Sequence, residues 1–99
     1  MKKEFHNEIL LSEDKSIIIE YYITQTEVSD ENFNPQKKYG IEVLKKQILF
    51  GNTYREIKRI DNMFEDPLQA KAVLDILHRN SVTPIAVSDV MEDISSMKV

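Results

Sequence analysis

The chain contains no cysteine and no tryptophan, and it has only two glycines and three prolines among 99 residues. Without cysteine it cannot build a disulfide framework, a thiolate zinc site or a cysteine nucleophile, and a reducing cytoplasm suits it. Two glycines leave little scope for a glycine-rich loop around a phosphate group. The composition therefore excludes several common classes of small functional domain.

Long apolar runs are also missing. No stretch approaches the length of a membrane span, and the basic pair Lys2–Lys3 is not followed by the apolar core of a secretory signal. With 41% hydrophobic residues, a chain of this length can bury one core without disulfides or metals, but it is too short for two domains. We expect a single cytoplasmic domain over residues 1–99 that does not bind membranes.

The first part of the chain has strand patterns. β-Branched and aromatic residues fill most of 17–24, which predicts a strand over 16–28 with its odd positions facing the core. A shorter strand is predicted over 5–11 and should pair with it as a hairpin. Three apolar residues of this first strand are expected to share one face: Phe5, Ile9 and Leu11.

Turn-forming and charged residues crowd together in 29–38. This segment is predicted to be the longest loop and the most mobile part of the chain, with Phe33 exposed within it.

Two further strands, 39–50 and 53–60, flank the dipeptide Gly51–Asn52, whose leading glycine suits a type II′ turn. The register of that hairpin would place Lys45 directly across from Lys58. Opposed lysines are unfavourable when they are close. We therefore expect this stretch to be solvated, to place its lysines diagonal to an acid, or to be shifted by a bulge.

The end of the chain has helix patterns. Asp66 and Pro67 are typical of an N-cap and a first helical position, and apolar residues follow at helical spacing as far as Arg79. A last short helix is predicted after Ser88, and residues 95–99 should fray. The expected fold is α+β: a four-stranded antiparallel β-meander packed on one face by an α-helix, with a short C-terminal helix. The pattern leaves open which sheet face the last helix covers.

Catalytic motifs are not found: the sequence has no nucleophile elbow, phosphate-binding loop, EF-hand or paired-histidine motif. His6 and His78 have no orienting partner nearby in the sequence, so we interpret them as solvated surface residues. We expect no enzymatic activity, no cofactor and no catalytic residue.

Three acids, Asp89, Glu92 and Asp93, share one face of the last predicted helix. The simplest interpretation is that acids near a helix N-terminus complement the helix dipole. A docking face for a basic partner is a second interpretation. A metal site is the weakest, because three carboxylates do not form a complete cage.

Charge is segregated along the chain. Residues 37–59 carry a net charge of +5, whereas the remaining residues carry −9. The charges of the basic segment can be solvated or compensated internally, contact an acidic protein or a second copy, or bind phosphate groups. An overall net charge of −4 disfavours long-range attraction to nucleic acid, so nucleic acid is not an expected partner.

A sheet with one helical layer leaves its other face free to recognise a partner. We therefore expect a small protein-interaction or regulatory module that acts through the uncovered sheet face or a sheet edge. The partner would be another protein or a second copy of the chain. The alternative is a binder of phosphate ligands or nucleic acid that uses the basic hairpin. The candidate interaction residues are Tyr22, Lys46, Phe50, Tyr54, Arg55 and Arg59.

Four short segments, in their order and spacing, resemble a small uncharacterised domain family of clostridia and related Firmicutes. These segments are 39–42 (YGIE), 60–62 (IDN), 80–84 (NSVTP) and 89–93 (DVMED). The resemblance covers nearly the whole chain and implies a bacterial, intracellular, single-domain protein of unknown role. It transfers no catalytic residues. Within these segments, Gly40 is typical of a strand start or a bulge, and Thr83–Pro84 of an extended link.

Overall fold

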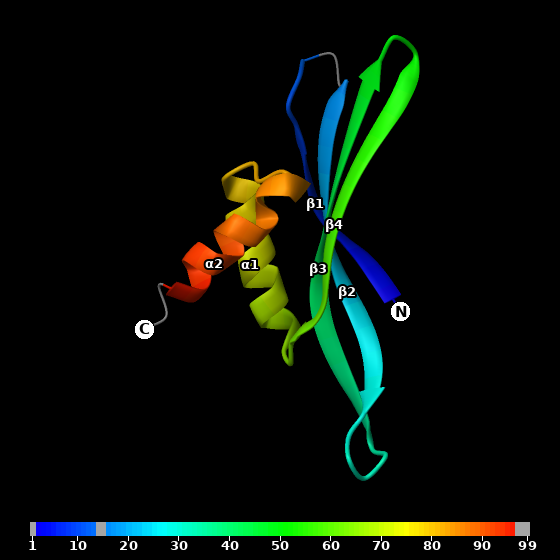
Figure 1. The fold of residues 1–99 in the computed structure, drawn as a ribbon, viewed down its shortest axis with the longest axis vertical. Coiled ribbons are helices and arrows are strands. Elements are labelled where there is room, and N and C mark those ends of the chain that lie inside the picture. Colours follow the sequence, from blue (N-terminus) through cyan, green and yellow to red (C-terminus); the bar gives the residue numbers. More distant parts are fainter. Residues whose placement is uncertain (1, 14–15, 97–99) are drawn as a thin grey trace.

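The computed structural model describes residues 2–13 and 16–96. The four strands are β1 (Lys2–Leu10), β2 (Ile17–Ser29), β3 (Pro35–Leu49) and β4 (Asn52–Phe64). They form one antiparallel sheet in chain order. The helical elements are α1 (Pro67–Arg79), a 3-10 turn (Pro84–Ala86) and α2 (Val87–Ser96). Figure 1 shows α1 and α2 together on one side of the sheet. This arrangement confirms the predicted α+β fold and places the last helix on the same face as α1.

The core lies between the helices and one sheet face. Strand β2 turns its odd positions toward the helices, as predicted, and Ile19 and Tyr21 are fully buried there. Strand β3 adds Ile41 and Val43. Helix α1 packs against these side chains with four buried residues, Ala70, Val73, Leu74 and Leu77. Helix α2 completes the same core with Val87 and Met91. The inward-facing side chains of the strands and the apolar stripe of α1 therefore pack together in one core layer.

Helix α1 has the boundaries that the sequence predicts. The Asp66 carboxylate accepts a hydrogen bond of 2.8 Å from the backbone N–H of Leu68, and Pro67 occupies the first helical position. The Tyr21 hydroxyl donates a buried hydrogen bond of 2.9 Å to the carbonyl oxygen of Val82, just after the helix. This bond joins the C-terminal end of α1 to the centre of the sheet.

The turn between β3 and β4 differs from the prediction. Phe50 and Gly51, not Gly51 and Asn52, are the central residues, and both have positive φ angles, 51° and 79°. Two positive φ angles define a type I′ turn, whose twist matches that of the flanking strands. Leu49 therefore pairs with Asn52.

The register prediction for this hairpin was wrong for the same reason. Lys45 pairs with Glu56, and Lys58 lies opposite Val43. The shifted register replaces two opposed lysines by an acid–base pair, which is the more favourable cross-strand arrangement.

Strand β1 contains a β-bulge at His6. Phe5 pairs with Tyr22, whereas Asn7 pairs with Tyr21, so one extra residue separates the two pairs. The bulge reverses the alternation, and Phe5 does not share a face with Ile9, contrary to the prediction. Leu11 lies beyond the end of the strand.

A second, larger bulge in β4 closes over Gly40. Tyr39 pairs with Phe64 while Ile41 pairs with Ile60, so residues 61–63 bulge out opposite Gly40. A Cβ atom on Gly40 would lie 2.0 Å from the carbonyl oxygen of Ile60. The structure thus confirms Gly40 as a bulge position, and it shows that only glycine fits there.

The connection between β2 and β3 is shorter than predicted. Strand β2 continues through Ser29 and β3 begins at Pro35, so the expected 29–38 loop is reduced to residues 30–34. Phe33 is exposed, as predicted, and its φ angle is 62°. The mobility of this connection stays a prediction.

At the C-terminal end, α2 includes residues 95 and 96, which were expected to fray, and the prediction for 97–99 lies outside the described residues. Among the described helices, none is long and apolar enough to cross a membrane.

Candidate functional site

The sheet face turned away from the helices is the main candidate site, and we call it the open face. Its members follow from the strand pairing and the two-residue alternation of β-strands. β1 and β2 contribute Lys3, Phe5, Glu8, Leu10, Ile18, Glu20, Tyr22 and Thr24. β3 and β4 contribute Glu42, Leu44, Lys46, Ile48, Arg55, Ile57, Arg59 and Asp61.

An ion-pair network occupies the centre of the open face. The side chain of Glu42 is only 7% exposed, and its carboxylate lies 2.9 Å from the Lys3 ammonium group and 4.0 Å from the Arg59 guanidinium. Arg59 also contacts the Asp61 carboxylate at 3.2 Å. A buried carboxylate is tolerated only when it is paired in this way. The network links β1, β3 and β4 across the face.

Tyr22 lies beside this network and connects it to a second ion pair. Its hydroxyl donates a hydrogen bond of 2.7 Å to Glu20, and the Lys46 ammonium group contacts the same carboxylate at 2.7 Å. Burial raises the pKa of Tyr22 to about 12, and the hydrogen bond to Glu20 adds to that shift. Burial alone would raise the pKa of Glu20, but hydrogen bonds from Lys46 and Tyr22 outweigh it and lower that pKa.

The ring of Tyr22 is enclosed from the β1 side. The Phe5 ring packs edge-on against it with 5.7 Å between ring centroids, and the Lys3 ammonium group lies 4.6 Å from its centre. Edge-to-face and cation–π contacts of this kind are favourable. The position of Phe5 on this face is a direct result of the β1 bulge.

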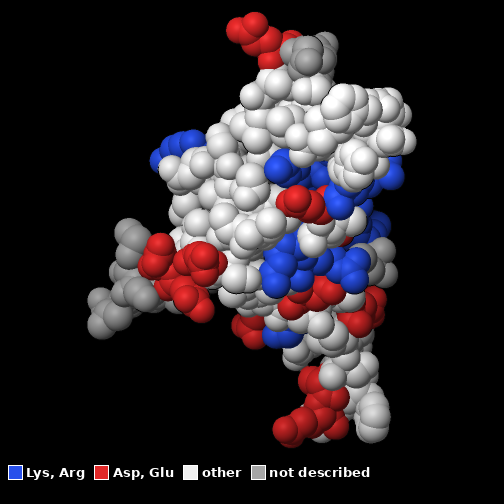
Figure 2. Space-filling view, turned by 45° about the horizontal axis from the view of Figure 1, so that its top comes forward, with Lys and Arg blue, Asp and Glu red and all other residues white. Residues whose placement is uncertain are grey.

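Apolar side chains on the open face lie among the charged ones. Leu10 is 46% exposed, Ile48 50% and Ile57 61%, and Ile18 and Leu44 lie between them. Figure 2 shows that basic and acidic side chains alternate in a band on the surface of the molecule. Exposed apolar side chains on a sheet face that also carries charged groups are typical of an interaction surface.

The structure separates the six candidate interaction residues. Four of them share the open face: Tyr22, Lys46, Arg55 and Arg59. Tyr54 pairs with Gln47 and faces the other side of the sheet. Phe50 lies at the tip of the turn, where it is 99% exposed, so it borders both faces.

Part of the charge in the basic segment is compensated internally: three of its seven bases form ion pairs. Lys46 pairs with Glu20, Arg59 with Glu42 and Asp61, and Lys38 with Glu65 at 2.8 Å. Sequence reasoning missed Glu20, Glu42 and Lys3 as members of the site. Their only signal is the alternation of strands whose pairing is known, because Lys3 and Glu42 are 39 residues apart.

A comparison with known protein families identifies the chain. The family described as "Family of unknown function (DUF6514)" matches residues 1–97. The chain belongs to DUF6514. No curated protein and no solved structure gives a significant match. Membership of an uncharacterised domain family, expected from the sequence, is confirmed, and the clostridial origin stays a prediction. Because DUF6514 has no assigned activity, the function has to be argued from geometry.

The two histidines of this DUF6514 chain are not solvated surface residues, contrary to the prediction. The side chain of His6 is 17% exposed, and its Nε2 lies 2.7 Å from a carboxylate oxygen of Asp75 on α1. His78 Nε2 lies 3.1 Å from the carbonyl oxygen of Glu8, and its ring packs edge-on against Tyr21. Both histidines therefore hold β1 against α1.

The acidic face of α2 shows no ligand-binding geometry in this DUF6514 structure. Asp89, Glu92 and Asp93 are exposed. Within residues 2–13 and 16–96, no group of three or more His, Asp or Glu side chains is placed to hold a metal ion.

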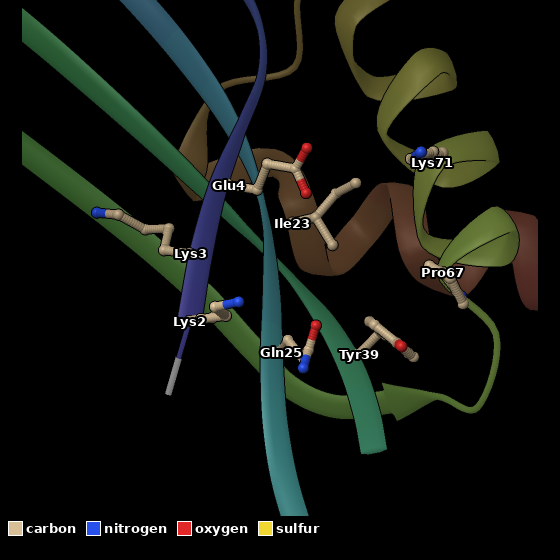
Figure 3. A pocket seen from close by; sticks show the side chains of 8 residues that line it. All are labelled: Lys2, Lys3, Glu4, Ile23, Gln25, Tyr39, Pro67 and Lys71. Atoms are coloured by element: carbon tan, nitrogen blue, oxygen red, sulfur yellow. The ribbon is translucent and has the colours of Figure 1, made fainter.

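A second candidate site of the DUF6514 chain is a pocket of about 520 Å³ between the sheet and the first turn of α1. Figure 3 shows its lining side chains, which come from β1, β2, β3 and α1. The apolar part is formed by Ile23, Tyr39 and Pro67, and the polar part by Lys2, Glu4, Gln25 and Lys71. Lys3 also borders the pocket, but its ammonium group is bound to Glu42 on the open face.

Proposed function

We propose that this DUF6514 chain is a small, non-enzymatic interaction module of the bacterial cytoplasm whose open face packs against the open face of a second copy. The observation that carries the proposal is the one-sided helical layer. It leaves Leu10, Ile48 and Ile57 about half exposed on the opposite side of the sheet. Several exposed apolar side chains on one sheet face favour association.

Charge balance supports a second copy as the partner. The open face holds four bases (Lys3, Lys46, Arg55, Arg59) and four acids (Glu8, Glu20, Glu42, Asp61). A face with equal numbers of both signs gives no reason to attract a strongly acidic or strongly basic partner. It can, however, complement itself.

The arrangement of the two unpaired charges also favours a two-fold symmetric dimer. Within the described chain, neither the Glu8 carboxylate nor the Arg55 guanidinium has an ion-pair partner. Glu8 lies on edge strand β1 and Arg55 on edge strand β4. Glu8 is aligned across the sheet with Ile57, and Arg55 lies two residues along β4 from Ile57, on the same face. A two-fold axis parallel to the strands places β1 of one copy over β4 of the other. Glu8 of each copy then approaches Arg55 of the other copy.

The size of the face predicts a modest affinity. Four strands about 4.8 Å apart, each contributing about eight residues, give about 500 Å² of flat area per copy. A standard stable interface buries about 800 Å² per partner. We therefore propose a reversible dimer with a dissociation constant in the micromolar range.

The alternative, phosphate or nucleic-acid binding by the basic hairpin, has weaker support. Lys46 and Arg59 are already paired with acids, and releasing them would leave Glu20 and Glu42 without their partners.

The non-enzymatic part of the proposal is supported by the histidines. His6 and His78 bond β1 and α1 together rather than converging on the pocket.

Sedimentation velocity over about 1 to about 500 µM tests this proposal, a range that brackets micromolar dissociation constants. We expect the wild-type chain to shift from monomer to dimer and Ile57→Asp to remain a monomer. Leu68→Asp is the matched control, because Leu68 is 68% exposed but lies on α1, away from the open face. It should dimerise like the wild type. A wild-type chain that stays monomeric throughout the range would refute the proposal.

A further inference from the structure

The β1 bulge determines which side chains face the first turn of α1. Beyond the bulge, Asn7 pairs with Tyr21, and an uninterrupted strand would continue with Phe5 opposite Ile23 on the helix side. Instead, Glu4 takes the position opposite Ile23, and Phe5 turns to the open face. Polar side chains thus replace an aromatic ring at the end of the core. Bulges often redirect side chains next to binding sites.

The resulting pocket has the size and lining of a small-molecule site. Its volume of about 520 Å³ falls within the range of roughly 300–1,000 Å³ that is usual for ligand pockets. Its apolar part consists of Ile23, Tyr39 and Pro67. Figure 3 shows Glu4 and Ile23 directed toward α1, with Pro67 and Lys71 on the opposite wall.

The polar groups of the pocket are available for a ligand. Within the described part of the chain, no hydrogen bond or ion pair involves the side chains of Lys2, Gln25, Tyr39 or Lys71. The pocket contains the ammonium groups of Lys2 and Lys71 but only one carboxylate, that of Glu4, so it carries a net positive charge. The amide and the hydroxyl add neutral donors.

We propose that this pocket binds a small organic anion with a flat apolar body, of the aromatic carboxylate or aryl phosphate class. The ammonium groups of Lys2 and Lys71 meet the anionic group, and Gln25 donates a hydrogen bond to it. Ile23 and Pro67 contact the apolar body. The site lies on the helix side of the sheet, so it goes beyond the proposed dimer and does not depend on it.

An NMR titration of the ¹⁵N-labelled full chain tests the site, with benzoate and phenyl phosphate as probes and uncharged benzamide as the reference compound. We expect saturable shifts of the backbone amides of residues 2–4, 23–25 and 68–71 with at least one of the two anions, and none with benzamide. The same shifts should appear in Ile57→Asp, which separates this site from dimerisation.

Two matched variants locate the charge that matters. Lys71→Gln should weaken anion binding about threefold, as expected for loss of one partly exposed ion pair. Arg79→Gln removes the same charge from an exposed position on the same helix and should leave binding unchanged. The spectrum of each variant reports directly whether it is folded. The proposal is overturned if neither anion shifts these amides, if benzamide binds equally well, or if Lys71→Gln binds like the wild type.

Discussion

The ammonium group of Lys3 on β1 lies 2.9 Å from the carboxylate of Glu42 on β3, across the intervening strand β2. The same ammonium group covers the ring of Tyr22 on β2. One side chain of the edge strand therefore contacts both inner strands of the sheet. The open face is held together by such charged contacts, and exposed apolar side chains lie among them.

Glu42→Gln should lower the free energy of unfolding by about 1–2 kcal/mol, because it removes the shared partner of two cations. The cost stays below that of a fully buried pair, since Lys3 and Arg59 are nearly half exposed and can be hydrated. Urea unfolding measures the difference. Glu27→Gln is the control, because Glu27 is exposed on β2, and it should change the stability by less than about 0.5 kcal/mol. Equal effects of the two substitutions would contradict the role of the network.

Gly40→Ala should destabilise the chain by about 3 kcal/mol, because the new Cβ atom would collide with the backbone of the β4 bulge. Gly51→Ala provides the comparison within the same hairpin. Its Cβ atom meets open space, and only the positive φ angle makes it unfavourable, at about 1 kcal/mol. Thermal or urea unfolding should therefore show that Gly40→Ala is clearly less stable than Gly51→Ala. The reverse order would mean that the bulge does not close over Gly40.

Alkaline pH should weaken the fold through Tyr22. Its pKa is raised from 10.0 to about 12 in the folded chain, so folding favours the neutral hydroxyl. The corresponding stabilisation is complete below pH 10 and is lost as the pH rises through about 12. Urea unfolding at increasing pH should show that Tyr22→Phe loses less stability than the wild type. Tyr21 has a similarly raised pKa, so part of the loss remains in this variant. Identical losses in both chains would contradict the assignment.

The sequence predicts the parts of this fold that depend on local patterns. The alternation in β2 gives the correct buried positions, and Asp66 and Pro67 mark the start of α1 because capping is a local interaction. The bulge at His6 could not be predicted, since a single extra residue leaves no local signal. The turn was missed because Phe50, a bulky residue, adopts a positive φ angle.

The candidate site was only partly predictable for a related reason. The sequence correctly indicates that one sheet face is uncovered and that Tyr22, Lys46, Arg55 and Arg59 belong to it. It does not identify Glu20, Glu42 and Lys3, because their pairing depends on strand register. The opposed lysines Lys45 and Lys58 were the one available sign that the assumed register was unfavourable. The polar pocket depends on the bulge and was missed with it.

A charge-swap experiment tests the symmetric dimer most directly. Sedimentation equilibrium gives the dimer dissociation constant for the wild type, Glu8→Arg, Arg55→Glu and the double variant Glu8→Arg/Arg55→Glu. Each single reversal places like charges opposite each other across the interface and should weaken dimerisation about tenfold, whereas the double variant restores opposite charges and should recover most of the affinity. If the double variant dimerises no more tightly than the single variant with the lower dimer affinity, the proposed packing of the two open faces is contradicted.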